Sequence, residues 1–321
     1  MKNKDFVWYF LKNNKMKQVI KLVFLCAFMF IMGFQSFAIK PDSVYVLRPE
    51  NLGLIYRDLN VTTSDGLKIK TWLYPAQPAL SEKEINEAWN NLVKKPYKTI
   101  DKEPRPTIII ANGDAGNMSY QQVHFALNFT SKGYNVVTFD WRGFGESSEW
   151  EMDNNYLVYT EMLLDYDAVI KEVMRQEEVD TNRIAVFGWS TGAYLSMAAS
   201  SKYDNIKAFV GIGLITSFDD VLPLLKQLQT HKDRNFIVPD DYPKELLPVN
   251  LAANYNKSTF LIVGEKDNRT PVWMSKKIYS LLPSKKELWI VEGAKHGGQN
   301  GPIKDFKLFD ERFIEFLDKN L

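Results

Sequence analysis

Cysteine is almost absent from this sequence. The 321 residues contain one, Cys26, which lies inside an apolar run near the N-terminus. Leu25 precedes it where a lipoprotein attachment site would need a small residue, so we interpret Cys26 as an ordinary member of the apolar run. If that run is removed during export, the rest of the chain has no cysteine, and disulfides are excluded as a source of its stability.

Long apolar runs are also scarce, and the one at the N-terminus has the composition of a secretory signal. Lysines precede the run Val19–Phe34, and Ser36 and Ala38 follow it. A basic region, a short apolar region and small residues at −3 and −1 predict a signal peptide over residues 1–38, cleaved after Ala38, and hence a periplasmic or secreted protein. An uncleaved N-terminal membrane anchor is the alternative, although a run interrupted by Lys21 is short for a full span. We therefore expect no stable membrane span after cleavage.

The chain has no strong excess of charge of either sign. It carries 40 basic and 39 acidic residues, and without residues 1–38 it carries 34 and 38, a net charge near −4. This balance gives no reason to expect a nucleic-acid partner. No cluster of histidine, cysteine and carboxylate ligands appears, so no metal or organic cofactor is expected.

The start of the predicted signal peptide has two candidates. Translation from Met16 instead of Met1 would give a signal of more usual length, and both starts remain open.

Strand-like and helix-like segments alternate from about residue 56 to the end, which predicts an α/β fold with a mostly parallel sheet and helices on both faces. A hairpin is expected around Ser64–Gly66, a surface insertion at about 77–104, and a small cap at about 216–255 within one domain, 39–321. The expected central strands are apolar, β-branched runs: Thr107–Ala111, Val136–Phe139, Ile184–Phe187, Ala208–Ile212, Phe260–Val263 and Leu288–Val291. The expected helices are Tyr120–Ser131, Glu161–Gln176, Ala193–Ser200, Met274–Leu282 and Phe306–Lys319.

A candidate nucleophile lies between an expected strand and an expected helix. The sequence Gly188-Trp189-Ser190-Thr191-Gly192 follows the strand that ends at Phe187. Glycines two residues before and after a serine allow a strained strand-to-helix turn, which lifts the hydroxyl above the edge of the sheet. The five-residue pattern alone is weak evidence, but the elements on both sides make Ser190 the predicted nucleophile.

Histidine is scarce, which narrows the choice of a general base to three residues. His124 falls within an expected helix, and His231 falls among charged residues of the expected cap. His296 follows the last expected strand directly, in a glycine-rich loop. Its loop emerges at the carboxyl edge of the sheet, as does Ser190, so we predict His296 as the base.

A base of this kind needs a carboxylate to fix its tautomer and to stabilise its charged form. Asp267 follows the strand that ends at Val263, and the chain order Ser, Asp, His is the order typical of this type of site. Glu265 is the rival carboxylate, closer to the strand. We predict that Asp267 orients His296 and that Glu265 is a loop charge.

An oxyanion hole requires two backbone N–H donors. One is expected at Thr191, the residue after the nucleophile. The other is expected in Asn112–Asn117, the glycine-containing loop after the first central strand, where we assign it to Asp114.

These residues together resemble the α/β-hydrolase superfamily over about residues 56–321. The stretch Asp140–Ser147 (DWRGFGES) is similar to a D-x-R-G-x-G-x-S segment common in that superfamily, where it is a structural turn. The Asn112–Asn117 loop (NGDAGN) resembles the H-G-N-A-G-N loop of a subgroup of membrane-associated and secreted serine hydrolases, but Asn112 replaces the histidine and Asp114 the asparagine. A carboxylate close to a forming oxyanion is unfavourable, so the Asp114 side chain is expected to point away or to be paired.

The resemblance implies acyl transfer through an acyl-enzyme on Ser190, and an ester of a small-molecule or acylated substrate is the expected target. A peptidase or amidase of the same fold is the close alternative, because the same catalytic residues serve both bond types. A non-catalytic binding protein is the other class, although binding alone gives no physical need for serine, histidine and aspartate at three such loops. The cap leucines, such as Leu225, are expected to pack the cap onto the body and not to line an acyl site.

Overall fold

The computed structural model of the protein describes residues 38–228, 234–283 and 285–321. Within these residues the main sheet has eight strands in the order β10-β9-β8-β7-β4-β6-β3-β2. All neighbouring pairs from β10 to β6 are parallel, whereas β3 runs antiparallel to both of its neighbours. The strand bounds are β2 Arg57–Thr62, β3 Lys68–Tyr74, β4 Arg105–Ile110, β6 Asn135–Phe139, β7 Val179–Trp189, β8 Ile206–Ile212, β9 Ser258–Gly264 and β10 Lys286–Val291.

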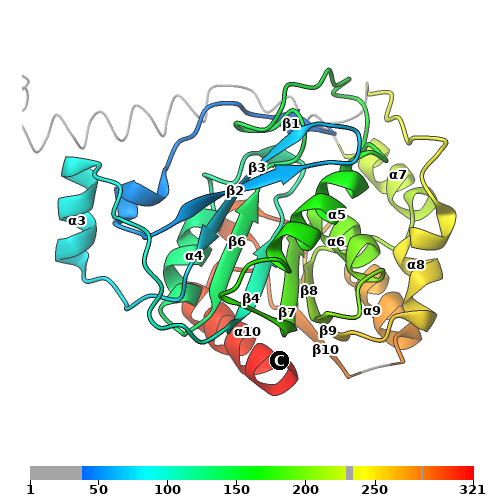
Figure 1. The fold of residues 1–321 in the computed structure, drawn as a ribbon. Coiled ribbons are helices and arrows are strands. Elements are labelled where there is room, and N and C mark those ends of the chain that lie inside the picture. The colour runs from blue at the N-terminus through cyan, green and yellow to red at the C-terminus, as the bar shows by residue number, and fades with distance from the viewer. Residues whose placement is uncertain (1–37, 229–233, 284) are drawn as a thin grey trace, which may run out of the picture. The chain divides into compact units, whose positions relative to one another are not determined.

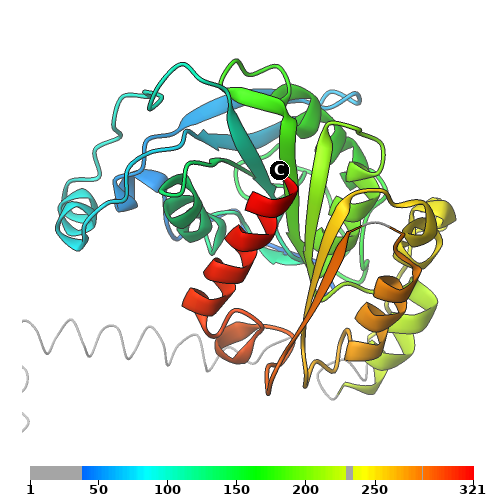
Figure 2. The ribbon, with the colours of Figure 1, turned by 90° about the horizontal axis from the view of Figure 1, so that it is seen from below.

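Helices cover both faces of the sheet, as Figures 1 and 2 show. One face packs against α5 (Met162–Val173), α6 (Thr191–Ser200) and α9 (Val272–Leu281), and the other against α4 (Gln122–Thr130) and α10 (Phe306–Asn320). Successive residues of a strand point to opposite faces of the sheet. Ile109 therefore packs in the core beneath α5, α6 and α9, while Ile108 and Ile110 pack in the core beneath α4 and α10. Continuous β-branched runs are therefore buried on both sides, and the predicted fold class is confirmed.

Helices also lie in the two segments expected as a surface insertion and a cap. The insertion carries α3 (Glu82–Asn91), whose residues are all at least partly exposed; Ser81 caps its N-terminus by accepting the N–H of Glu84. The cap carries α7 (Phe218–Gln227) and the short helix α8 (Pro248–Leu251). The predicted hairpin is formed by β2 and β3.

One pairing was not predicted from the sequence. The short strand β1 (Lys40–Pro41) lies parallel to β5 (Ala115–Gly116), in the loop that follows β4. Strands of two residues are too short to show an alternating pattern, so they could not be predicted from the sequence. The predicted signal peptide, apart from Ala38, lies outside the described residues.

A buried ion pair fixes the Asp140–Ser147 turn. Arg142 has a side chain that is 1% exposed, and it donates from Nε and Nη2 to Oδ1 of Asp165 at 2.9 and 2.8 Å. Its backbone N–H donates to the other oxygen of Asp165, and Nη1 donates to Asp65 in the hairpin turn. The segment therefore ties α5 and the β2–β3 hairpin to the sheet, in agreement with its expected structural role.

Replacing Asp165 with Asn should lower the free energy of unfolding by about 3 kcal/mol, because it leaves the buried Arg142 charge without its fully buried partner and with only the more exposed Asp65. Urea denaturation followed by circular dichroism measures the change. Glu311→Gln serves as the control, since Glu311 and Lys307 form an exposed pair at 3.8 Å and such pairs contribute little. Equal denaturation midpoints for Asp165→Asn and Glu311→Gln would contradict the argument.

Candidate functional site

Ser190 lies at the turn between β7 and α6, in a backbone conformation that side chains rarely adopt. Its φ is 54° and its ψ is −118°, and its N–H donates to the carbonyl of Ile212 on β8 at 2.8 Å. A β-carbon at Gly188 would collide with the carbonyl of Gly192, and one at Gly192 would collide with the carbonyl of Asn112. The two glycines are thus required by close backbone approach, and the strain is concentrated on Ser190.

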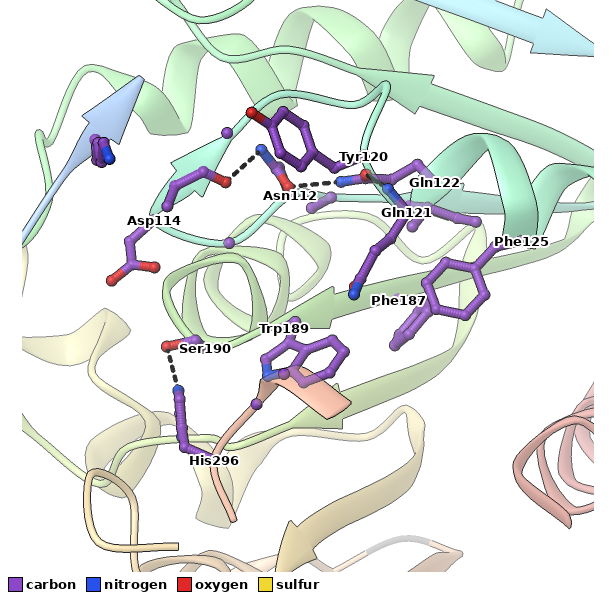
Figure 3. Close-up of a pocket in the computed structure, with 18 of the residues that line it drawn as sticks. Asn112, Asp114, Tyr120, Gln121, Gln122, Phe125, Phe187, Trp189, Ser190 and His296 are labelled. Atoms are coloured by element: carbon purple, nitrogen blue, oxygen red, sulfur yellow. Dashed lines mark hydrogen bonds between the residues drawn. The ribbon is translucent and has the colours of Figure 1, made fainter. Parts of the chain in front are cut away.

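The structure brings together the three side chains predicted as a catalytic set. His296 Nε2 lies 3.1 Å from Ser190 Oγ, a contact drawn in Figure 3, and His296 Nδ1 lies 2.8 Å from Asp267 Oδ2. The Asp267 side chain is fully buried and that of His296 is 12% exposed. A hydroxyl, an imidazole and a buried carboxylate are therefore in one hydrogen-bonded line, the arrangement needed to transfer a proton from serine to histidine.

The loop after β9 holds Asp267 as an anion. Its Oδ1 accepts the backbone N–H groups of Arg269 and Thr270, both at 2.9 Å, and its Oδ2 accepts the Thr270 hydroxyl at 2.8 Å. Burial alone would raise the pKa of Asp267, but its hydrogen bonds to His296 and Thr270 and the charge of His296 together hold it below the ordinary value. The carboxylate consequently stays charged below the usual titration range of an aspartate.

The rival residues lie elsewhere. Glu265 Oε2 accepts the N–H of Gly293 at 2.8 Å, so this carboxylate joins the two loops that carry Asp267 and His296. His124 is an exposed residue of α4. His231 lies outside the described residues.

The two residues predicted as oxyanion donors, Thr191 and Asp114, both line a narrow cavity that reaches Ser190. Thr191 is the first residue of α6, so its N–H has no acceptor within the helix. The Asn112–Asn117 loop begins where Asn112 touches Gly192, and Asn112 is held by Gln122, whose Nε2 donates to its Oδ1 at 2.8 Å. The predicted donors at Thr191 and Asp114 therefore come from segments in direct backbone contact.

The Asp114 carboxyl does not point away from the site, contrary to our expectation. Figure 3 shows it on the Ser190 side of its loop, and among the described residues it forms no ion pair. Burial raises the pKa of Asp114, while the charges of Arg269 and His296 partly offset that rise. Repulsion between the carboxylate and a forming oxyanion favours an outward side chain, and no pattern in the sequence indicates that the loop turns Asp114 inward.

Two cavities of unequal size meet at Ser190. The wide one has a volume of about 420 Å³, and its walls include polar and aromatic residues such as Tyr120, Gln121 and Trp189, together with His296 and Gly297. The narrow one has a volume of about 50 Å³. Its walls are Thr191, Asp114, Arg269, Thr270 and a set of apolar side chains from the body and the cap: Leu157, Tyr194, Ile215, Phe218, Val221 and Leu225.

Sequence reasoning missed three features of this site. Leu225, on α7, lines the narrow cavity and so does more than pack the cap onto the body. Thr270 contacts both Asp267 and the Nδ1 of His296, and Arg269 reaches both cavities. The spacing of two and three residues after Asp267 is typical of an aspartate that accepts local backbone N–H groups, and this signal could have identified the loop.

Within residues 38–228, 234–283 and 285–321, no helix is long and apolar enough to cross a membrane.

Comparisons with known proteins agree with this geometry. The profile of the prolyl oligopeptidase family (Peptidase_S9) matches residues 120–321. The uncharacterized protein YfhR of Escherichia coli K12 is 23% identical over 318 residues, covering 95% of each chain. Among solved structures, the esterase Pf2001 of Pyrococcus furiosus has 21% identity and a TM-score of 0.63, covering 88% of this chain and 99% of its own. A puromycin-hydrolyzing peptidase of Mycobacterium tuberculosis has 18% identity and a TM-score of 0.61, and the match covers 88% of this chain and 40% of the peptidase.

At these identities the structural matches show the fold alone, and they confirm the α/β-hydrolase architecture. The family profile covers more than half of the sequence, from α4 to the last helix. The chain therefore belongs to the prolyl oligopeptidase family and is a hydrolase of the α/β-hydrolase fold.

Proposed function

We propose that this protein is a serine esterase that cleaves esters of short acyl groups, with Ser190 as nucleophile, His296 as general base and Asp267 as the carboxylate that orients it. The observation that carries the proposal is the hydrogen-bonded line from Ser190 Oγ through His296 to Asp267. Thr191 and Asp114 are proposed to donate their backbone N–H groups to the oxyanion.

The mechanism follows from these positions. Ser190 Oγ attacks the ester carbonyl as its proton passes to His296 Nε2, and the carbonyl oxygen becomes an oxyanion. When the tetrahedral intermediate collapses, the bond to the leaving oxygen breaks and His296 returns the proton to it. Water then attacks the acyl-enzyme, giving its proton to the same imidazole, and Ser190 is regenerated with release of the acid. Each oxyanion donor typically contributes about 3–4 kcal/mol to this step.

The two cavities define which part of the ester lies where. His296 must reach the leaving oxygen, and His296 and Gly297 line only the wide cavity of the two. Thr191, one of the proposed oxyanion donors, lines the narrow one. The leaving group is therefore assigned to the wide cavity and the acyl group to the narrow one.

The size of the narrow cavity limits the acyl group. A water-sized atom needs roughly 10–15 Å³ of cavity volume. The narrow cavity, with a volume of about 50 Å³, therefore has room for about four non-hydrogen atoms. Its walls are mostly apolar, which favours an uncharged aliphatic chain. Acetyl to butyryl esters fit this description.

A peptidase or amidase activity is the second candidate, and the family match favours it. The family is named for peptidases, and one structural neighbour is described as a puromycin-hydrolyzing peptidase. The proposed catalytic residues would act on an amide in the same way. Comparing p-nitrophenyl esters with aminoacyl p-nitroanilides decides between the two, since faster turnover of the anilides would replace the ester proposal.

We also propose that residues 1–38 are a signal peptide and that the protein is exported, with an uncleaved anchor as the alternative. Residues 1–37 lie outside the described residues, so composition carries this proposal. Ala38 is 4% exposed, and its N–H donates to the carbonyl of Asn154. Because a protease needs an accessible segment, cleavage after Ala38 would have to precede docking of this region. An exported product whose mass retains residues before Ile39 would contradict cleavage at this site.

Fluorophosphonate labelling tests the nucleophile. The native protein should be modified at one site, and Ser190→Ala should not be modified, because the only activated hydroxyl is removed. Ser196→Ala, which alters a buried serine of the same helix, is the control and should still be labelled. Labelling of Ser190→Ala at an undiminished rate, or failure of the native protein to react at all, would refute the serine-hydrolase mechanism.

Enlarging the narrow cavity should shift the preference toward longer acyl chains. Leu225→Ala is expected to raise the ratio of kcat/KM for octanoyl over butyryl p-nitrophenyl ester at least tenfold, because the new space accepts the chain. Leu224→Ala is the matched control, since Leu224 lies on the same helix but does not line the cavity. An unchanged ratio in Leu225→Ala would place the acyl group elsewhere.

Asp114→Asn should raise activity in a pH-dependent way. The raised pKa keeps the Asp114 carboxyl neutral up to a higher pH than an ordinary aspartate, and as pH rises through that pKa a negative charge develops near the oxyanion. A charge repulsion of about 1.4 kcal/mol, modest for partly buried groups, corresponds to about tenfold in rate. The ratio of kcat for Asp114→Asn to kcat for native protein should therefore be near one at low pH and about ten at alkaline pH. A ratio that stays constant across the pH profile would argue against this repulsion.

A further inference from the structure

Residues 39–46, here called the N-terminal strap, run along the Asn112–Asn117 loop. The N–H of Lys40 donates to the carbonyl of Asp114 at 2.7 Å, and the N–H of Asp42 donates to the carbonyl of Gly116 at 3.1 Å. These bonds form the parallel pairing of β1 with β5. The strap thus fixes two alternate peptide units of the loop, 114–115 and 116–117, on the C-terminal side of the proposed donor.

Asn117, the last residue of the loop, adds side-chain bonds to the same strap. It is fully buried, and its Nδ2 donates to the carbonyls of Asp42 and Val44 at 2.8 and 2.9 Å. Its Oδ1 accepts both the N–H and the hydroxyl of Ser119, and that hydroxyl accepts the N–H of Val46. The loop and the strap therefore share one continuous hydrogen-bond network.

The strap has its own anchors in the body of the protein. Ile39 is fully buried in the core that contains α5 and α6. The Tyr45 hydroxyl donates to Oδ2 of Asp140, whose Oδ1 accepts the N–H of Met118 just after the loop. The carbonyl of Asp42 also accepts the N–H of Gly145. Because it is anchored in this way, the strap can impose a shape on the loop and does not merely follow it.

The loop has few other supports. Of the carbonyls of Asp114, Ala115 and Gly116, the first and third accept from the strap, and the second accepts from Asn112 Nδ2 at 3.3 Å. Gly116 has a φ of +83°. Because glycine has no side chain to restrict its backbone, this part of the loop depends on outside contacts to keep its shape. The family match begins at Tyr120, so neither the strap nor the loop falls within it.

We propose that the N-terminal strap is a positioning element that holds the Asp114 amide in the oxyanion hole, so that the segment directly after the predicted signal sequence controls the rate of the chemical step. This inference rests on the proposed function. Lys40 and Asp42 act through their backbone N–H groups and touch no reacting atom. If the loop turns, the donor leaves the oxyanion while the acyl and leaving-group cavities keep their walls, so the effect is expected on kcat and not on KM.

Proline substitution tests the strap because it removes a single N–H. Lys40→Pro is compared with Lys40→Ala, which loses the same side chain but keeps the donor to Asp114. We expect kcat for a p-nitrophenyl ester to be about 10–100-fold lower in Lys40→Pro than in Lys40→Ala, with the KM values of the two variants within about twofold of each other. This decrease in kcat is smaller than the decrease on removing an oxyanion donor completely, because the loop is displaced and not deleted. Equal kcat values in the two variants would overturn the proposal.

A transition-state analogue separates positioning from general damage. Phenylboronic acid forms a tetrahedral adduct on an active serine, with a charged oxygen in the oxyanion hole. Its inhibition constant should rise in Lys40→Pro by about the same factor as kcat falls, and thermal melting should stay close to that of Lys40→Ala. A fall in kcat with an unchanged inhibition constant would assign Lys40 a different role.

A second pair keeps the test decisive if Lys40→Pro does not fold. Asp42→Pro removes the N–H that donates to Gly116, and Asp42→Ala is its reference; the same fall in kcat and rise in inhibition constant are expected. Native protein that neither turns over esters nor reacts with a fluorophosphonate would instead refute the proposed function. Active native protein with equal kcat in both members of a pair would refute only the role of the strap.

Discussion

The site depends on a contact between two backbones with no side chain between them. Where α6 begins, Gly192 lies so close to the carbonyl of Asn112 that any β-carbon would collide with it, and a β-carbon at Gly188, on β7, would collide with the carbonyl of Gly192. This approach brings the N-terminus of α6 and the loop after β4 together, and the two proposed oxyanion donors lie on these segments. Ser190, between the two glycines, has a positive φ. The strain at the proposed nucleophile and the proximity of the proposed donors thus occur in one crowded turn.

The proposed base, His296, and the carboxylate proposed to orient it, Asp267, are held in a different way, by two loops bonded to each other. The N–H of Lys266 donates to the carbonyl of Ala294, and the Glu265 carboxylate accepts the N–H of Gly293. Thr270 lies between Asp267 and His296 and contacts both. Because these bonds join the loops after β9 and β10, the distance from Asp267 to His296 is set before any substrate arrives. The preorganised carboxylate then stabilises the imidazolium at no cost in reorganisation.

Most of the fold could be predicted because its signals are local. Six apolar runs predicted the central strands, and a polar, helix-prone stretch predicted a helix in the region of α3, which has no fully buried residue. The residues Ser190, His296 and Asp267 could be nominated because the carboxyl ends of parallel strands meet at one edge. What could not be predicted depends on contacts between distant segments. The pairing of Lys40 with Ala115 joins residues that are far apart and carry no shared pattern, and the inward turn of Asp114 has no local sequence signal either.

The two halves of the proposed reaction therefore depend on different parts of the chain. The proposed proton transfer uses Ser190, Asp267 and His296, which all lie within the family match and follow strands at the centre and one side of the sheet. The proposed stabilisation of the oxyanion uses in addition a loop outside that match, which pairs with a segment that begins at Ile39. A change in the strap would alter how well negative charge is stabilised while leaving the hydrogen bond from Ser190 to His296 intact. Rate could in this way be adjusted from the N-terminus without disturbing the core on which the fold depends, since electrostatic stabilisation is sensitive to small displacements of a donor.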